Sequence, residues 1–266
     1  MNDVSSTALL VGACALVGLL VGSFLNVVIW RVPRGESVVT PPSHCPACDR
    51  PVAPRDNVPV LSWLLLRGRC RDCGVRVSPR YAIVEVGTAV LFGVMAVKLG
   101  LHAALPAFLF LAAIGLALAI IDIDHKRLPF ALTMPAYPVA VVLLAAAALI
   151  DHRPERIVTM LVGMAALFGL YFLLNVVNPR GMGFGDVMLA GVLGIYLGFL
   201  GWSTLLVGAF LGFFFGAAGG LLLIAARRGG MKSQVPFGPY MLTGALVAIL
   251  AGPQLAHVYL HATLGG

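Results

Sequence analysis

Four carboxylic side chains stand at or inside the ends of long apolar segments, where acidic residues are rare. Asp122 and Asp124 close one segment in AIIDIDHKRLPF, Asp186 opens another in GMGFGDVMLAG, and Glu85 lies near the start of a third. A carboxylate at bilayer depth is costly, so such residues usually mark a functional site or an ion path. Two carboxylates within a few ångströms share one proton, so the ionised one can activate water while the protonated one polarises a carbonyl. This is the chemistry of peptide-bond hydrolysis by an aspartyl pair.

Other roles are open to these aspartates. Asp186 could cap its helix, where the helix dipole stabilises a negative charge without any chemistry. The aspartates could also line an ion path, or pair with the basic residues Lys126, Arg127 and Arg180. Asp122 and Asp124 are about 200° apart around a helix, so both cannot face the same partner.

Glycines surround Asp186 on its amino-terminal side. Gly181, Gly183 and Gly185 alternate with larger residues in the stretch GMGFGD. Glycine lets the backbone bend tightly and lets another chain approach closely. We therefore expect Gly183 and Gly185 to bind an extended substrate.

Four of the five cysteines form two CxxC pairs, CPAC at Cys45 and Cys48 and CRDC at Cys70 and Cys73. Two such pairs at this separation are typical of a zinc ribbon or knuckle, in which four thiolates form a tetrahedron around the ion. Two disulfides or an iron site are the alternatives. A closed four-sulfur site leaves no open position, so we expect a structural ion, while Cys14 is a small residue inside an apolar segment.

The composition indicates what kind of structural elements position these groups. The chain of 266 residues is 60% hydrophobic and only 11% charged, whereas soluble domains have about 25% charged residues. We predict an all-α polytopic membrane protein with about eight transmembrane helices and a small cytoplasmic zinc-binding loop domain. The expected parts are a first transmembrane helix at 1–30, the zinc-ribbon-like domain at 31–80 and a transmembrane core at 81–266. The candidate spans are 7–30, 82–100, 104–124, 131–150, 157–177, 187–201, 204–226 and 239–262.

The basic residues predict the orientation. Of the eighteen Lys and Arg residues, all but Lys98, Arg153 and Arg156 fall on the face that carries the 31–80 segment. The positive-inside rule makes that face cytoplasmic and puts both termini on the other side. The aspartates then all lie at the cytoplasmic boundary. The net charge of +7 is explained by topology and an attraction to the lipid bilayer, without a nucleic-acid partner.

Six motifs, spread over nearly the whole chain, resemble those of the prepilin peptidases of type IV pilus and type II secretion systems, a family of GxGD aspartyl proteases. They are GSFLNVVIWRVP, the CPAC and CRDC pairs, SPRYAIVEVGTAV, IDIDHKRLP, GMGFGDVMLAG and VPFGPYMLTGA. The resemblance implies a multi-pass enzyme of the bacterial inner membrane with its active site facing the cytoplasm. Such an enzyme cuts the leader from prepilin or pseudopilin precursors. It then methylates the new amino terminus with S-adenosylmethionine.

The resemblance also implies site residues. The first catalytic aspartate precedes the Leu of a Leu-Pro pair by six residues, which gives Asp122, with Asp124 as the alternative, and the second is Asp186. The four loop cysteines would hold zinc. This chain has Phe130 after Leu-Pro, where the family commonly has an acidic or amide residue. The methyl-donor site is not placed by any motif; Glu85 and the GSFLNVV segment are candidates. The identity of the precursor and the oligomeric state stay open.

Two functions of other classes compete with the enzyme. A cation transporter with a regulatory zinc domain would use the aspartates as ion ligands, although none of them lies near the middle of the bilayer. A non-enzymatic scaffold of a secretion machine would use the zinc loop for docking, and it would tolerate loss of either aspartate.

Overall fold

The computed structural model describes residues 2–179, 182–225 and 236–264, and in this part of the chain all regular elements are helical apart from two isolated β-bridges. The long helices are α1 (Asn2–Arg31), α3 (Arg80–Leu99), α4 (Leu105–His125), α5 (Phe130–Ile150), α6 (Glu155–Val177), α7 (Phe184–Leu200), α8 (Trp202–Ala225) and α9 (Gly238–Leu264). The segment between α1 and α3 contains η1 (Val32–Arg34), η2 (Pro54–Asp56) and α2 (Leu61–Leu65).

The predicted fold class is confirmed. Each of the eight predicted spans corresponds to one long helix, and seven of these helices are long and apolar enough to cross a membrane. The eighth, α7, is apolar but shorter, as expected for the sixth span. The chain is therefore an all-helical, multi-pass membrane protein. Several basic residues behind the predicted orientation, together with Gly181, lie outside the described residues: Arg180, Arg227, Arg228 and Lys232.

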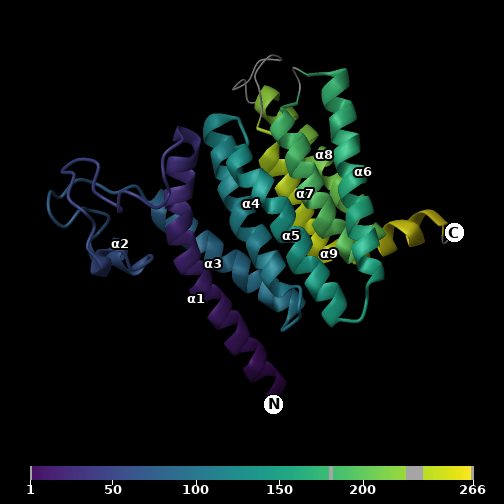
Figure 1. Cartoon of the computed structure of the whole chain (residues 1–266), viewed down its shortest axis with the longest axis horizontal. Helices are drawn as coiled ribbons and strands as arrows, with labels where there is room; N and C mark the ends of the chain where they lie inside the picture. Colours follow the sequence, from purple (N-terminus) through teal and green to yellow (C-terminus); the bar gives the residue numbers. More distant parts are fainter. Residues whose placement is uncertain (1, 180–181, 226–235, 265–266) are drawn as a thin grey trace. The chain divides into compact units, whose positions relative to one another are not determined.

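The chain divides into two compact units, which we call unit 1 (Met1–Ala117) and unit 2 (Leu118–Gly266). In unit 1, α1 packs along α3, with the 32–79 loop between them in sequence (Figure 1). The helices approach closely at two glycines of α1. A Cβ atom on Gly18 would lie 2.7 Å from Ala89 Cα, and one on Gly22 would lie 2.7 Å from Glu85 Cα. Small residues four apart thus bring the backbones into contact, as is common between membrane helices.

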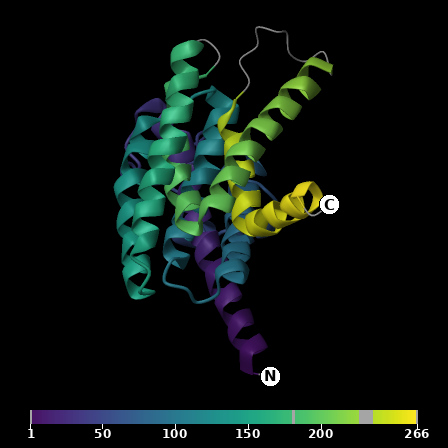
Figure 2. The ribbon, with the colours of Figure 1, turned by 90° about the vertical axis from the view of Figure 1, so that its right-hand side faces the viewer.

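In unit 2, α7 is the central helix. All residues from Asp186 to Phe199 are buried, and α5, α6, α8 and α9 all contact α7. Figure 2 shows this bundle from the side, with the carboxyl-terminal part of α9 bending away from it. Close packing again depends on small residues, because Gly163 of α6 lies directly against Gly194 and Gly198 of α7. A helix that is enclosed by protein on all sides need not match the length of a lipid-exposed span.

The start of α7 differs from the prediction by a few residues. The helix begins at Phe184 instead of residue 187, because Gly183 forms the N-cap with extended backbone (φ −75°, ψ 149°) and the side chain of Asp186 accepts the Gly183 N–H. Asp186 therefore lies in the first turn of the helix.

Candidate active site and metal centre

Asp122 lies in the last turn of α4, where it is only 4% exposed. Its Oδ2 accepts a hydrogen bond of 2.9 Å from the backbone N–H of Gly238, the first residue of α9. The carboxylate thus sits at the amino terminus of a second helix, where unpaired N–H groups and the helix dipole favour a negative charge. Gly238 also leaves the space for it, since a Cβ there would lie 2.9 Å from Oδ2.

Asp186 is 9% exposed and is held in the same manner. Its Oδ2 accepts a hydrogen bond of 3.0 Å from the N–H of Gly183, and its own N–H donates to the Gly183 carbonyl at 3.0 Å. The capping role considered from the sequence is therefore real. A cap contact through Oδ2 is compatible with chemistry at the other carboxylate oxygen.

The two aspartates are brought together within unit 2. Their charges interact, and that of Asp186 also reaches Tyr171 of α6. Leu128, which is buried, packs against the first turn of α7, which carries Asp186, and against the start of α9, which binds Asp122. A Cβ on Gly185 would lie 2.9 Å from Leu128 Cβ, and one on Gly238 would lie 3.4 Å from Leu128 Cδ2. The Leu-Pro segment thus lies between the first turn of α7 and the start of α9 and keeps them apart.

The other aspartate of α4 faces elsewhere. Asp124 is exposed, as are Lys126 and Arg127, whereas Asp122 is buried. This follows from the roughly 200° between residues two apart on a helix. Arg180, the remaining basic partner considered from the sequence, lies outside the described residues.

Gly183 and Gly185 have clear packing roles. The Gly183 N–H holds Asp186, and Gly185 leaves room for Leu128. Their binding of substrate stays a prediction. The contact of Gly238 with Asp122 was not expected from the sequence, although its stretch VPFGPYMLTGA belongs to the family motifs. The available signal was a glycine followed by proline at a helix start.

The four loop cysteines form one cluster in unit 1. The Sγ atoms of Cys45, Cys48, Cys70 and Cys73 all lie within 4.8 Å of one another, and all four are free thiols. Tetrahedral ligands at a zinc–sulfur distance of about 2.3 Å are separated by about 3.8 Å. The distance from Cys45 Sγ to Cys73 Sγ is 3.8 Å. The cluster fits a four-thiolate metal site and could hold a metal ion.

Each CxxC pair lies on the same kind of turn. In the first, the Cys45 N–H donates to the Arg50 carbonyl at 2.9 Å, and in the second the Cys70 N–H donates to the Val75 carbonyl at 2.9 Å. An isolated β-bridge closes each turn, one joining residues 44 and 51 and the other residues 69 and 76. The residue after each second cysteine has positive φ, with Asp49 at 58° and Gly74 at 70°. Asp and Gly are among the residues that adopt this conformation readily.

The thiols have very different acidities. Backbone N–H groups of Ala47 and Cys48 lower the pKa of Cys45 to about 7. The Val75 N–H acts in the same direction on Cys73, but desolvation and hydrogen bonding with the other three thiols raise the pKa of Cys73 to about 12. Four adjacent thiolates repel one another, so a bound cation is needed to ionise the whole set.

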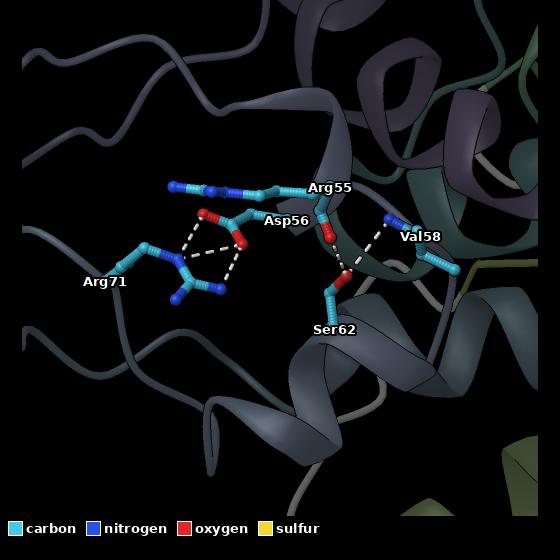
Figure 3. Close-up of polar contacts among 5 residues, drawn as sticks. All are labelled: Arg55, Asp56, Val58, Ser62 and Arg71. Carbon is cyan, nitrogen blue, oxygen red and sulfur yellow. Dashed lines mark hydrogen bonds and ion pairs between the residues drawn. The ribbon is translucent and has the colours of Figure 1, made fainter.

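Ion pairs link the two CxxC turns to each other and to the loop before α2. Arg50 Nη1 lies 3.1 Å from Asp72 Oδ1 and so joins the first turn to the second. Arg71 contacts both carboxylate oxygens of Asp56, with Nη2 at 2.6 Å and Nε at 2.8 Å (Figure 3). The hydrogen bond from Arg71 lowers the pKa of Asp56. Asp56 therefore stays ionised, and the pair intact, until the pH falls below the ordinary carboxyl range.

Glu85 belongs to unit 1 and is 7% exposed. Its Oε2 accepts a hydrogen bond of 2.6 Å from the N–H of Val60, in the loop just before α2. Another buried charge, Arg31 at the end of α1, donates to the carbonyls of Ser37 and Pro41 at 2.9 and 2.7 Å. The position of Glu85 inside an apolar segment marked it in the sequence but indicated no partner, and no sequence pattern distinguished Arg31. Both side chains fasten the loop backbone to a membrane helix.

Two family models match the chain: the Bacterial Peptidase A24 N-terminal domain over residues 16–99 and the Type IV leader peptidase family over residues 109–221. A prepilin leader peptidase/N-methyltransferase of Stutzerimonas stutzeri is 34% identical over 272 residues, which cover 93% of this chain and 93% of the relative. The chain belongs to the type IV leader peptidase family. The resemblance drawn from its motifs is confirmed.

Other members of the type IV leader peptidase family match equally broadly. A prepilin leader peptidase/N-methyltransferase of Aeromonas hydrophila is 33% identical, with 92% of each chain covered. A type 4 prepilin-like proteins leader peptide-processing enzyme of Escherichia coli is 33% identical, over 87% of this chain and 90% of the relative. No solved structure gave a significant match. The leader peptidase segment contains both buried aspartates, and the N-terminal domain segment contains the four cysteines and Glu85.

Proposed function

We propose that this chain is a membrane aspartic endopeptidase that removes the leader peptide from type IV prepilin-like proteins and methylates the new amino terminus. Relatives with these two activities in their names match more than 90% of the chain. The observation that carries the peptidase is the pairing of Asp122 and Asp186. Both are buried, each is held by one backbone N–H at a helix start, and their charges interact.

In the proposed mechanism the two carboxyl groups share one proton. The ionised aspartate takes a proton from water as the water attacks the scissile carbonyl, and the protonated aspartate polarises that carbonyl and then protonates the leaving amine. Because Gly238 and Gly183 hold the Oδ2 atoms, we assign the Oδ1 atoms to water and substrate. We choose Asp122 over Asp124 as the first aspartate because Asp124 is exposed on another side of α4.

The substrate's own chemistry agrees with this location. A prepilin or pseudopilin has a basic leader followed by an apolar helix, so its scissile bond lies at the membrane surface. We place the enzyme in the bacterial inner membrane, with the active site and the 31–80 domain on the cytoplasmic side and both termini in the periplasm. The orientation follows from the positive-inside rule. There the leader stays in water while the apolar helix enters the lipid.

We propose that the four-cysteine cluster holds a structural Zn²⁺ ion, since four thiolates in a closed tetrahedron are a common structural zinc site. Cys45, Cys48, Cys70 and Cys73 would supply all of its ligands. S-adenosylmethionine would supply the methyl group for the second activity.

The test is cleavage of a prepilin-like substrate by the purified protein in detergent, with wild type beside Asp186→Asn. Asparagine keeps an oxygen that accepts the Gly183 N–H, so the cap survives, but it cannot share a proton. We expect a loss of about 10²- to 10⁴-fold in cleavage rate, the usual contribution of a general acid or base. Glu36→Gln, an exposed acid in the loop, is the matched control and should cut normally.

If the Asp186→Asn variant cuts at the wild-type rate, Asp186 serves only as a helix cap and the aspartyl mechanism is wrong. Transfer of a labelled methyl group from S-adenosylmethionine to the trimmed product tests the second activity in the same reaction. If the wild-type protein transferred no methyl group, the chain would be a peptidase without methyltransferase activity.

A further inference from the structure

Glu85 is a buried carboxylate that the proposed peptide hydrolysis does not use. It hydrogen-bonds the Val60 N–H at 2.6 Å, and the Ser23 hydroxyl of α1 also bonds to it. The polar contacts of Glu85 thus reach one loop residue and one residue of the neighbouring helix. The loop residue that it contacts, Val60, has an unusual backbone conformation.

Val60 adopts a conformation that its side chain disfavours. Its φ is 59° and its ψ is −50°, and the Leu61 N–H donates to the Pro59 carbonyl at 2.5 Å across it. This is a γ-turn with positive φ, which is rare and strained, and β-branched residues are particularly unsuited to it. Such strain persists only where the surroundings enforce it, and it concentrates at functional sites. The Glu85 carboxylate accepts the N–H of Val60 and so contacts the backbone of this turn directly.

The strained turn belongs to a segment that we call the strap, residues 54–62. Ser62, which is buried, closes the strap on itself: its Oγ donates to the Arg55 carbonyl at 3.0 Å and accepts the Val58 N–H at 3.1 Å. Figure 3 shows both bonds beside the pair of Asp56 and Arg71. Displacement of Val60 would therefore also move the part of the strap that carries Asp56.

Asp56 connects the strap to the CxxC turns. Its partner Arg71 lies inside the CRDC turn, between the ligand candidates Cys70 and Cys73. The neighbouring Asp72 pairs in turn with Arg50 of the first turn. Polar contacts and short stretches of backbone thus connect Glu85 through the strap to both CxxC turns.

We propose that Glu85 is a positioning residue for the four-cysteine centre: by holding the strained turn at Val60 it fixes the strap, which fixes the CRDC turn through Asp56 and Arg71. This inference rests on the metal site of the proposed function. Groups outside the ligand set orient the ligands, and their loss typically lowers metal affinity by about 10- to 100-fold. Glu85 does this from inside a membrane helix.

The test is the zinc affinity of the full-length protein in detergent, measured by competition with a chromophoric chelator. Glu85→Gln keeps a weaker acceptor for Val60, and Glu85→Leu removes the acceptor. We expect a graded loss that reaches about tenfold in Glu85→Leu. Glu36→Gln repeats the charge change on an exposed loop residue and should bind zinc as wild type does.

A second substitution separates this role from a general loss of folding. Val60→Gly lets the turn form without strain, because glycine adopts positive φ readily. Placed in the Glu85→Leu background, it should restore most of the zinc affinity. Wild-type affinity in Glu85→Leu, or no recovery on adding Val60→Gly, would overturn the proposal.

The same preparations separate this inference from the proposed function. Wild-type protein that cuts the substrate but holds no zinc would overturn the inference and leave the peptidase standing. Wild-type protein that holds zinc with the predicted Glu85 dependence but does not cut would leave the inference standing and remove the peptidase.

Discussion

At the scale of the residue, the candidate active site consists of two carboxylates that are each held by one backbone N–H. Asp122 has the Gly238 N–H at the start of α9, and Asp186 has the Gly183 N–H at the start of α7. Both hydrogen bonds lie at helix amino termini, which stabilise negative charge. The repulsion between the two carboxylates opposes full ionisation of the pair. A single shared proton satisfies both conditions.

The first prediction concerns the space at Gly238. Gly238→Ala should lower the cleavage rate by about 10- to 100-fold, because the new methyl group would lie 2.9 Å from Asp122 Oδ2 and displace the carboxylate. The backbone itself accepts alanine, since Gly238 does not have positive φ. Gly220→Ala, whose Cβ would meet nothing within 4 Å, is the control. Equal cleavage rates for the two variants would show that the position of Asp122 does not depend on this contact.

At the scale of the element, α7 carries Asp186 and depends on close packing. A Cβ on Gly194 would clash with the Gly163 carbonyl of α6. Gly194→Leu should therefore destabilise the protein by about 1–3 kcal/mol, the usual cost of overpacking, and lower the melting temperature in detergent. Gly169→Leu adds the same side chain to α6 where nothing lies within 4 Å, and should change the melting temperature little. A Gly194→Leu protein as stable as wild type would contradict this packing.

The loop between α1 and α3 is the other element whose stability can be predicted. Apart from α2 and two short 3-10 turns it has no regular helix, and small polar segments of this kind need a staple such as a metal. Removing zinc with a chelator should expose residues 36–77 to protease while the helices of unit 2 stay intact. Mass spectrometry of the fragments checks this. A cleavage pattern unchanged by the chelator would mean that the loop folds without metal.

The helices, the four-cysteine cluster and the local cap of Asp186 were predictable from the sequence, whereas the distant partners of Asp122 and Glu85 were not. Apolar length and the spacing of CxxC pairs are local signals, so each can be read from a few neighbouring residues. The hydrogen bond from Gly238 to Asp122 joins residues 116 positions apart, and that from Val60 to Glu85 joins residues 25 apart. Such partners are determined by packing, which no local pattern reports. The helix geometry predicted that Asp122 and Asp124 cannot both face the same partner, but it did not predict which of the two is buried.

At the scale of the whole molecule, the distribution of basic residues predicts the orientation in the membrane. The 31–80 segment should be cytoplasmic and the end of α9 periplasmic. A phosphatase reporter that is active only outside the cytoplasm should be inactive when fused after Arg80 and active when fused after Leu264. The reverse pattern would place the four cysteines in an oxidising compartment, where disulfides would be favoured over a zinc site.

The central claim is that Asp122 and Asp186 form the aspartyl pair, and comparison of Asp122→Asn with Asp124→Asn tests it most directly. The two variants make the same chemical change two residues apart on α4, one buried and one exposed. In a cleavage assay with a prepilin-like substrate, Asp122→Asn should lose about 10²- to 10⁴-fold in rate while Asp124→Asn cuts as wild type does. An active Asp122→Asn beside an inactive Asp124→Asn would contradict the buried pair and assign the chemistry to the exposed carboxylate.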